Sequence, residues 1–268
     1  MSTERLPAMP ARRRALASLG LNLARRGVLA TVSLVIGALT ILGALGVTAS
    51  LLRRGGGATF EEVPSLAAGA LAWGAGVLFA FAVSTHALKR DREAGITALL
   101  RARGASLSGY LWTRVGGLTG WLVLLVAGGT LLVGLVATLL SARAGASLRT
   151  LQGTGAAVAY ALAFALTLGP LAMAALGARS RAGGYLWLLV VLVVPQLLAP
   201  MSGALLPYGF GELTSIPGAL AALRASLMPP GVDAWRATKA LFVLALVVAV
   251  CLAGVRRAAR RAQQEEAP

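Results

Sequence analysis

VLATVSLVIGALTILGALGVTASLL, residues Val28 to Leu52, is a continuous apolar run without a single charged side chain. About 20 predominantly apolar residues in an α-helix are enough to cross the hydrocarbon core of a bilayer. The run is also much longer than the apolar core of a typical signal peptide. We therefore expect an uncleaved first transmembrane helix; cleavage as a signal peptide near Val47 to Ala49 is the alternative interpretation.

Charged residues divide the remainder of the chain into five more apolar runs. Hydrophobic residues make up 57% of the sequence, which is hard to reconcile with a soluble domain of 268 residues. The sequence thus predicts an all-α integral membrane protein with six transmembrane helices, in a single domain that covers residues 1–268. The expected spans are approximately residues 28–52, 66–88, 115–142, 150–178, 182–207 and 237–255.

The sequence RRRALASLGLNLARRG lies directly before the first run. Leu16, Leu19 and Leu23 recur at helical spacing, and arginines such as Arg12 and Arg25 flank them at both ends. This pattern predicts an amphipathic helix that lies in the headgroup plane of the membrane. A plain basic leader is the alternative.

The 25 arginines and lysines far outnumber the 9 acidic residues, which gives a formal net charge of +16. These cations lie at the ends of the apolar runs and do not form one surface with interleaved aromatic residues, so membrane topology explains them better than nucleic-acid binding. Most of them fall in segments that share a side with the N-terminus. Because cytoplasmic loops retain arginine and lysine, both termini are predicted to be cytoplasmic.

The sequence carries few groups for chemistry. It has no GxxxxGK[ST] phosphate-binding loop, no HExxH, CxxC or GxSxG motif, one histidine and one cysteine. The interiors of the expected spans contain no Asp, Glu or Arg, which ion-coupled transporters generally need at membrane depth. We therefore expect no catalytic residues, no metal site and no cofactor bound by this chain. If the protein moves a substrate uphill, the energy must come from another polypeptide.

The most elaborate polar segment, ALKRDREAGITALLRARGASLSGYLWTR, separates the second and third runs. Its apolar residues return at intervals of three and four on both sides of Gly104, which predicts an amphipathic helix broken by this glycine. Such a helix suits a groove on a partner, and it equally suits the membrane surface. These apolar residues are Ile96, Leu99, Leu100, Leu107, Tyr110 and Leu111.

This segment resembles the cytoplasmic signature of the type 2 ATP-binding-cassette (ABC) exporter permeases. Asp91 and Glu93 match the acids of that signature, Gly95 its glycine, and Arg114 its closing base. The departures are Ile96, where threonine is usual, and Gly104, where the family has proline. The resemblance implies a coupling helix that contacts the ATPase through Arg90, Asp91, Arg92, Glu93, Gly95, Ile96, Leu99, Leu100, Gly104 and Arg114.

The same resemblance covers the whole chain and implies a permease domain in the cytoplasmic (inner) membrane. It implies a second permease subunit, as a homodimer or heterodimer, and two copies of a separate ABC ATPase that binds ATP and magnesium. It also implies re-entrant helices in the proline-rich segment 195–235, for which a loop after a kinked fifth helix is the alternative. Two other classes of function remain open: a membrane scaffold that recruits a partner without transport, and a lipid-modifying membrane enzyme.

Overall fold

The computed structural model of the chain describes residues 18–25, 27–54, 60–85, 87, 91, 93–96, 99, 107–142, 147–177, 181–198, 210–228 and 231–264. Within these ranges every regular element is a helix, which confirms the all-α prediction. This is the expected outcome for apolar segments in lipid, where each backbone N–H and C=O must be satisfied within its own helix.

Five of the helical segments are long and apolar enough to cross a membrane. The first is α2 (Val28–Arg54), and the last is α13 (Ala234–Gln264). Between them, three continuous helices each contain a π-helical stretch. They are α3 (Val63–Ala70) with η2 (Leu71–Gly76) and α4 (Val77–Ser84); α7 (Leu107–Leu122) with η3 (Val123–Gly128) and α8 (Gly129–Ser141); and α9 (Ser147–Ala172) with η5 (Met173–Gly177). Five of the six predicted spans are thus confirmed as helices of spanning length.

The remaining predicted span, residues 182–207, is not confirmed as one long helix. The helix α10 covers Arg181–Leu192, and a turn at Val193 separates it from helical residues 194–198. Pro195 explains the interruption, because it lacks an N–H donor and its ring clashes with the preceding turn. Residues 199–209 lie outside the described ranges, so whether the chain re-enters the membrane there stays a prediction.

Two short elements precede the last helix. A 3-10 helix, η6 (Phe210–Thr214), leads into α12 (Ile216–Leu227), an apolar helix too short to span a membrane. Ser215 caps α12, because its hydroxyl accepts a hydrogen bond of 3.0 Å from the backbone N–H of Gly218. The same hydroxyl donates to the side chain of Gln196 at 2.6 Å and so ties α12 to the segment that follows α10.

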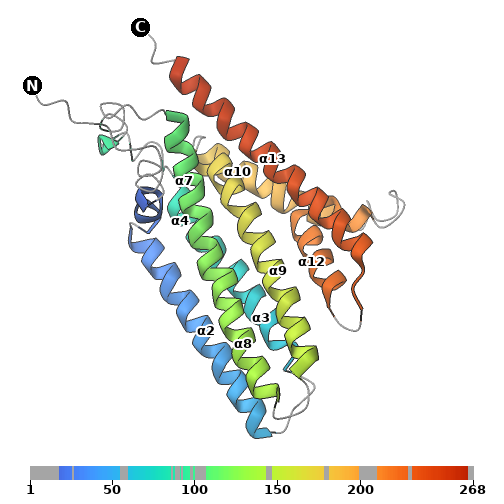
Figure 1. Cartoon of the computed structure of the whole chain (residues 1–268). Helices are drawn as coiled ribbons and strands as arrows, with labels where there is room; N and C mark the ends of the chain where they lie inside the picture. The colour runs from blue at the N-terminus through green and yellow to red at the C-terminus, as the bar shows by residue number, and fades with distance from the viewer. Residues whose placement is uncertain are drawn as a thin grey trace, which may run out of the picture.

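The helix α9 lies in the centre of the bundle and is the most buried of the five long helices. Figure 1 shows it between the α7–α8 helix and α12, with α13 crossing the bundle. Glycines permit close approach between α9 and two neighbours. A Cβ on Gly169 in α9 would lie 2.2 Å from Thr119 in α7, and a Cβ on Gly134 in α8 would lie 2.2 Å from Thr154 in α9. The helices α2 and α13 lie on the outside and are the least buried.

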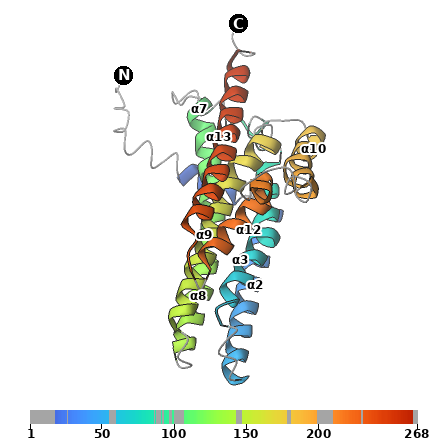
Figure 2. The same ribbon diagram turned by 90° about the vertical axis from the view of Figure 1, so that its right-hand side faces the viewer.

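The polar ends of several helices gather at one end of the bundle. In Figures 1 and 2, the ends of α4 and α13 and the start of α7 lie at the upper end. The end of α2, the end of α8 and the start of α9 lie at the opposite end. This arrangement places the segment between α4 and α7 on the same side as the C-terminal end of α13.

The short N-terminal helix, residues 18–24, packs directly on α7. A Cβ on Gly117 would lie 2.3 Å from the carbonyl oxygen of Gly20, so the two backbones are in contact. The indole Nε1 of Trp121 also donates a hydrogen bond of 2.9 Å to the carbonyl oxygen of Leu21. The helix is therefore attached to the bundle through its backbone.

A glycine pair on α7 tests this contact. Gly116 has open space around the position of a Cβ, whereas Gly117 has the Gly20 backbone. We expect Gly117→Ala to lower the stability by about 1–3 kcal/mol, because the backbones must separate. Gly116→Ala should be neutral or slightly stabilising, because alanine favours the helix. Thermal unfolding in detergent, followed by tryptophan fluorescence, measures both variants; equal shifts would contradict the contact.

Candidate functional site: a buried ion pair at the start of α7

Asp91 and Arg114 form a buried ion pair. The Asp91 carboxylate accepts hydrogen bonds from Arg114 in a bidentate arrangement, from Nε to Oδ2 at 2.7 Å and from Nη2 to Oδ1 and Oδ2 at 2.5 Å. The side chains are only 4% and 2% exposed, respectively. A planar guanidinium fork matches a carboxylate in this geometry, which a lysine at position 114 would not reproduce.

Tyr110 completes the cluster. Its hydroxyl donates to Oδ2 of Asp91 and accepts from Nε of Arg114 at 3.2 Å. Tyr110 and Arg114 are four residues apart on α7, so both side chains lie on the same face of the helix. The phenol therefore fixes the carboxylate against the guanidinium.

The contribution of the ion pair to folding stability does not by itself explain why two charges are buried here. Burying two charges has a large desolvation cost, and the mutual attraction offsets it only when the remaining donors are satisfied. Arg114 Nη1 is buried and has no hydrogen-bond partner within the described part of the chain. Arg114 lies in the second turn of the long helix Gly109–Ser141, near its polar end. A buried ion pair at this position is a functional-site candidate.

The ion pair attaches the segment between α4 and α7 to the bundle. Ala87 is fully buried, and Ile96 packs against the core. Gly95 has a φ of +70°, in the left-handed region that glycine adopts without strain. Leu99 points outward and is 56% exposed, and its backbone N–H donates to the Gly95 carbonyl at 3.0 Å. The segment thus has one face fixed to the bundle and an apolar side chain on the other.

The structure brings together only part of the predicted coupling set. Asp91 and Arg114 are in contact, Gly95, Ile96 and Leu99 lie in the adjoining segment, and Glu93 is exposed there. Four members of the set, Arg90, Arg92, Leu100 and Gly104, lie outside the described residues. The role of Tyr110 was missed: the sequence showed it only as part of an apolar stripe. Its spacing of four from Arg114 was the available signal.

The predicted interfacial helix is described only from residue 18 onward, so Arg12 and Leu16 lie outside the described part. Leu23 is buried, Leu19 is half-buried and packs on the core, and Arg25 is exposed. The leucine face of residues 18–24 is therefore turned toward the bundle. The arginine at its end remains at the surface.

The start of α7 also contacts the far end of the chain. The guanidinium carbon of Arg256, on α13, lies 5.1 Å from the centroid of the Trp112 ring. A cation over an indole face within about 6 Å is attracted by the ring quadrupole. The polar end of the bundle therefore joins α7 to α13 as well as to the segment that contains Asp91.

The described residues offer no group of three or more His, Cys, Asp or Glu side chains that could hold a metal ion. The fold and the site together define a helical protein compatible with the membrane, in which a buried ion pair fixes a polar segment at one end. Comparison with protein families, with curated proteins and with solved structures found no match to this chain.

Two carboxylates that each pair with an arginine, the buried Asp91 and the exposed Glu212, test the effect of burial on stability. Asp91→Asn leaves the Arg114 guanidinium buried without a counter-charge, and we expect a loss of about 3–5 kcal/mol in the free energy of unfolding. Glu212 pairs with Arg236 at the surface, where the two side chains are 61% and 40% exposed. Glu212→Gln should therefore cost less than about 1 kcal/mol.

Unfolding of both variants can be measured by titrating protein in mild detergent with sodium dodecyl sulfate and following far-ultraviolet circular dichroism. Similar losses for the two variants would contradict the buried pair as the anchor of the segment.

Proposed function

We propose that the chain is the membrane-spanning permease subunit of an ATP-driven ABC exporter. In this proposal the chain moves a substrate out of the cytoplasm and performs no chemistry itself. ATP and magnesium are bound by a separate ATPase subunit, of which two copies act on a permease pair. The contact between Asp91 and Arg114 carries the proposal, because it joins the first acid and the closing base of the motif that resembles the exporter signature.

The geometry suggests how a force on the polar segment reaches the membrane. Asp91 is fixed to Arg114 by bidentate hydrogen bonds, and Arg114 is part of the continuous helix from Gly109 to Ser141. A displacement of the segment therefore acts directly on the third span. The exposed Leu99 provides an apolar contact for a groove on the ATPase, and Gly95 permits the turn that presents it.

The proposed topology has six spans, with both termini and the segment 87–114 in the cytoplasm and the protein in the inner membrane. In this topology the helical residues 181–198 begin the fifth span. The gathering of the α7 start and the α13 end at one end of the bundle is consistent with a common cytoplasmic side (Figure 1). The short helix α12 then belongs to the outer part of the chain.

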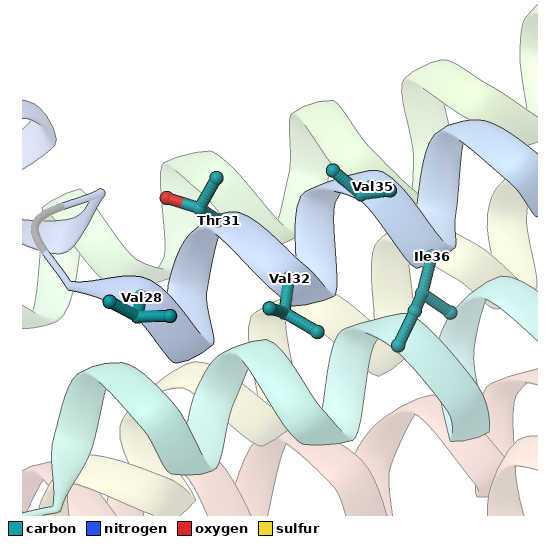
Figure 3. Close-up of a pocket in the computed structure, with 5 residues that line it drawn as sticks. All are labelled: Val28, Thr31, Val32, Val35 and Ile36. Carbon is teal, nitrogen blue, oxygen red and sulfur yellow. The ribbon is translucent and has the colours of Figure 1, made fainter.

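We further propose that two copies pair through α2. The exposed residues of this helix include a stripe at alternating intervals of four and three: Val28, Val32, Val35, Leu39 and Leu42. Such spacing suits packing against a second helix. Figure 3 shows the shallow apolar hollow at the beginning of α2, lined by Val28, Thr31, Val32, Val35 and Ile36. Gly43 and Gly46 further along α2 have open space around them, which permits close approach.

The coupling role is tested with a single cysteine at Leu99. The chain has one native cysteine, Cys251, which is buried, so Cys251→Ser provides a cysteine-free background. We expect the permease to co-purify with an ATPase, and ATP to reduce maleimide labelling of Leu99→Cys several-fold. Leu148→Cys is the control, because Leu148 is 81% exposed at the start of α9, at the opposite end of the bundle; its labelling should not respond to ATP.

Two results would contradict this role. Recovery of a partner without ATPase activity, with labelling of Leu99→Cys insensitive to nucleotide, would favour the membrane scaffold instead. A Gly95→Trp variant that exports normally would also count against coupling, since a tryptophan at a φ of +70° must distort the segment.

Pairing through α2 predicts cross-linking. In the Cys251→Ser background, Leu39→Cys should form disulfide-linked dimers when an oxidant is added to membranes, because symmetric stripes bring the two positions together. Leu186→Cys on α10 is the control, since Leu186 is equally exposed, at 64% against 62% for Leu39. Non-reducing gel electrophoresis separates the products. Dimers from Leu186→Cys alone would place the interface elsewhere.

A further inference from the structure

Three side chains from separate elements form a polar cluster within the bundle. The indole Nε1 of Trp73, in η2, donates a hydrogen bond of 2.8 Å to the hydroxyl of Tyr160 in α9. The guanidinium carbon of Arg224, in α12, lies 5.8 Å from the centroid of the Tyr160 ring. Phe164, one turn after Tyr160, packs edge-on against Trp73 with ring centroids 5.4 Å apart.

The cluster lies near the middle of the spanning helices. Tyr160 is about 20 Å from either end of the helix Ser147–Ala175, and Trp73 is about 15 Å from either end of Val63–Ser84, at a rise of 1.5 Å per residue. Arg224 reaches this depth because α12 packs beside α9, as Figures 1 and 2 show. An arginine from a short helix is thus held beside the centre of a span whose own charged residue, Arg149, lies at its beginning.

The cluster presents hydrogen-bond donors without an anionic acceptor. Among the described residues, no carboxylate forms an ion pair with Arg224. Within the same residues, its guanidinium makes a cation–π contact with the Tyr160 ring. The Tyr160 oxygen accepts from Trp73, and its own proton has no acceptor in the described part of the chain. A guanidinium and a phenol proton therefore converge at a place where an acidic group of a ligand is the missing partner.

The favourable interaction of Arg224 with the dipole of α12 does not offset the energetic cost of placing its charge at this depth. A cation in the last turn of a helix gains about 0.3–1 kcal/mol from the helix dipole. Placing an arginine at the centre of a membrane helix costs about 2.5–3.5 kcal/mol or more. The dipole thus offsets only part of the cost, and a charge kept at this depth indicates a binding role.

We propose that Arg224 and Tyr160 bind the acidic group, a carboxylate or phosphate, of an amphiphile whose apolar part lies against Trp73. Trp73 is 41% exposed and Arg224 is half-buried, so both are accessible from outside the single chain. Headgroups of bilayer lipids lie about 15 Å from the membrane centre, too far to reach this depth. The ligand is therefore a molecule that enters the protein, and not a bilayer lipid whose headgroup stays at the membrane surface. This proposal rests on the proposed function and deepens it, because it names a class of cargo.

Binding is measured on the full chain in nanodiscs of zwitterionic phosphatidylcholine, without any ATPase. The probe is 9,10-dibromostearate at pH 9, because bromine quenches nearby tryptophan and the acid is ionised. We expect saturable quenching of an emission component that Trp73→Phe removes. Arg224→Gln should weaken the apparent affinity about ten- to hundredfold, the loss of one hydrogen-bonded charge pair. Arg149→Gln is the matched control, since Arg149 is exposed on the same helix as Tyr160.

Two conservative variants distinguish a loss of binding from a loss of folding. Arg224→Lys retains the charge and should bind more tightly than Arg224→Gln, and Tyr160→Phe retains the ring but lacks the donated proton, so its affinity should fall. Equal quenching by the methyl ester, or unchanged affinity in Arg224→Gln, overturns the proposal. Equally tight, Trp73-dependent quenching by dibrominated phosphatidylglycerol would overturn the single-molecule ligand in favour of a bilayer lipid.

Because the measurement uses no ATPase and no export, it is separate from the test of coupling. A chain that binds the acid but does not couple to an ATPase would retain this site and lose the proposed function. A chain that couples but does not bind would retain the function and lose the site.

Discussion

Asp91 and Arg114 hold the polar end of the bundle together because neither charge is stable there alone. A buried carboxylate or guanidinium without a partner costs several kcal/mol, so the segment that carries Asp91 cannot leave α7 without exposing or neutralising both charges. The bidentate geometry and the Tyr110 hydroxyl restrict the pair to one arrangement. The position of Gly95 and Leu99 next to the bundle follows from this restraint.

The same argument distinguishes Arg114, which is buried, from Arg224, which is half-buried. Arg114 has its counter-charge within the chain, and its role is therefore to fix one element to another. Arg224 has an aromatic ring and no carboxylate among the described residues, so its electrostatic requirement is met only in part. In our proposals the paired Arg114 makes a mechanical connection, whereas Arg224, which has no carboxylate partner among the described residues, recognises an acidic ligand.

The sequence predicted what depends on local composition. Five spans were found because a run of apolar residues is itself the cause of a membrane helix, and the predicted bounds differ from those observed by only a few residues. The predicted fifth span failed as one long helix at Pro195, whose effect on the preceding turn overrides the hydrophobic run. Asp91 and Arg114 were selected through a family resemblance, and no spacing rule indicated that they would touch.

Contacts between distant elements could not be predicted. Gly20 and Gly117 touch backbone to backbone, but in a chain with 33 glycines nothing marks this pair; Gly116 and Gly120 have the more familiar spacing of four, and Gly116 faces open space. Arg224 lies in the proline-rich segment 195–235, for which the sequence left re-entrant helices and a loop as alternatives. The depth of Arg224 depends on the packing of α12 beside α9. Such tertiary packing cannot be inferred from the positions of charged residues in the sequence.

The two sites are connected by the way the π-helical stretches pack. Arg114 is on the helix that continues into η3, and Trp73 is on η2. A Cβ on Gly76, in η2, would lie 3.1 Å from Val126 in η3 and 3.2 Å from Phe164 in α9, so three elements meet at this glycine. π-helical turns interrupt the regular hydrogen-bond pattern of a helix and are frequent at functional sites. If the two proposed sites are coupled, η3 and η2 are the elements in contact that join α7 to Trp73.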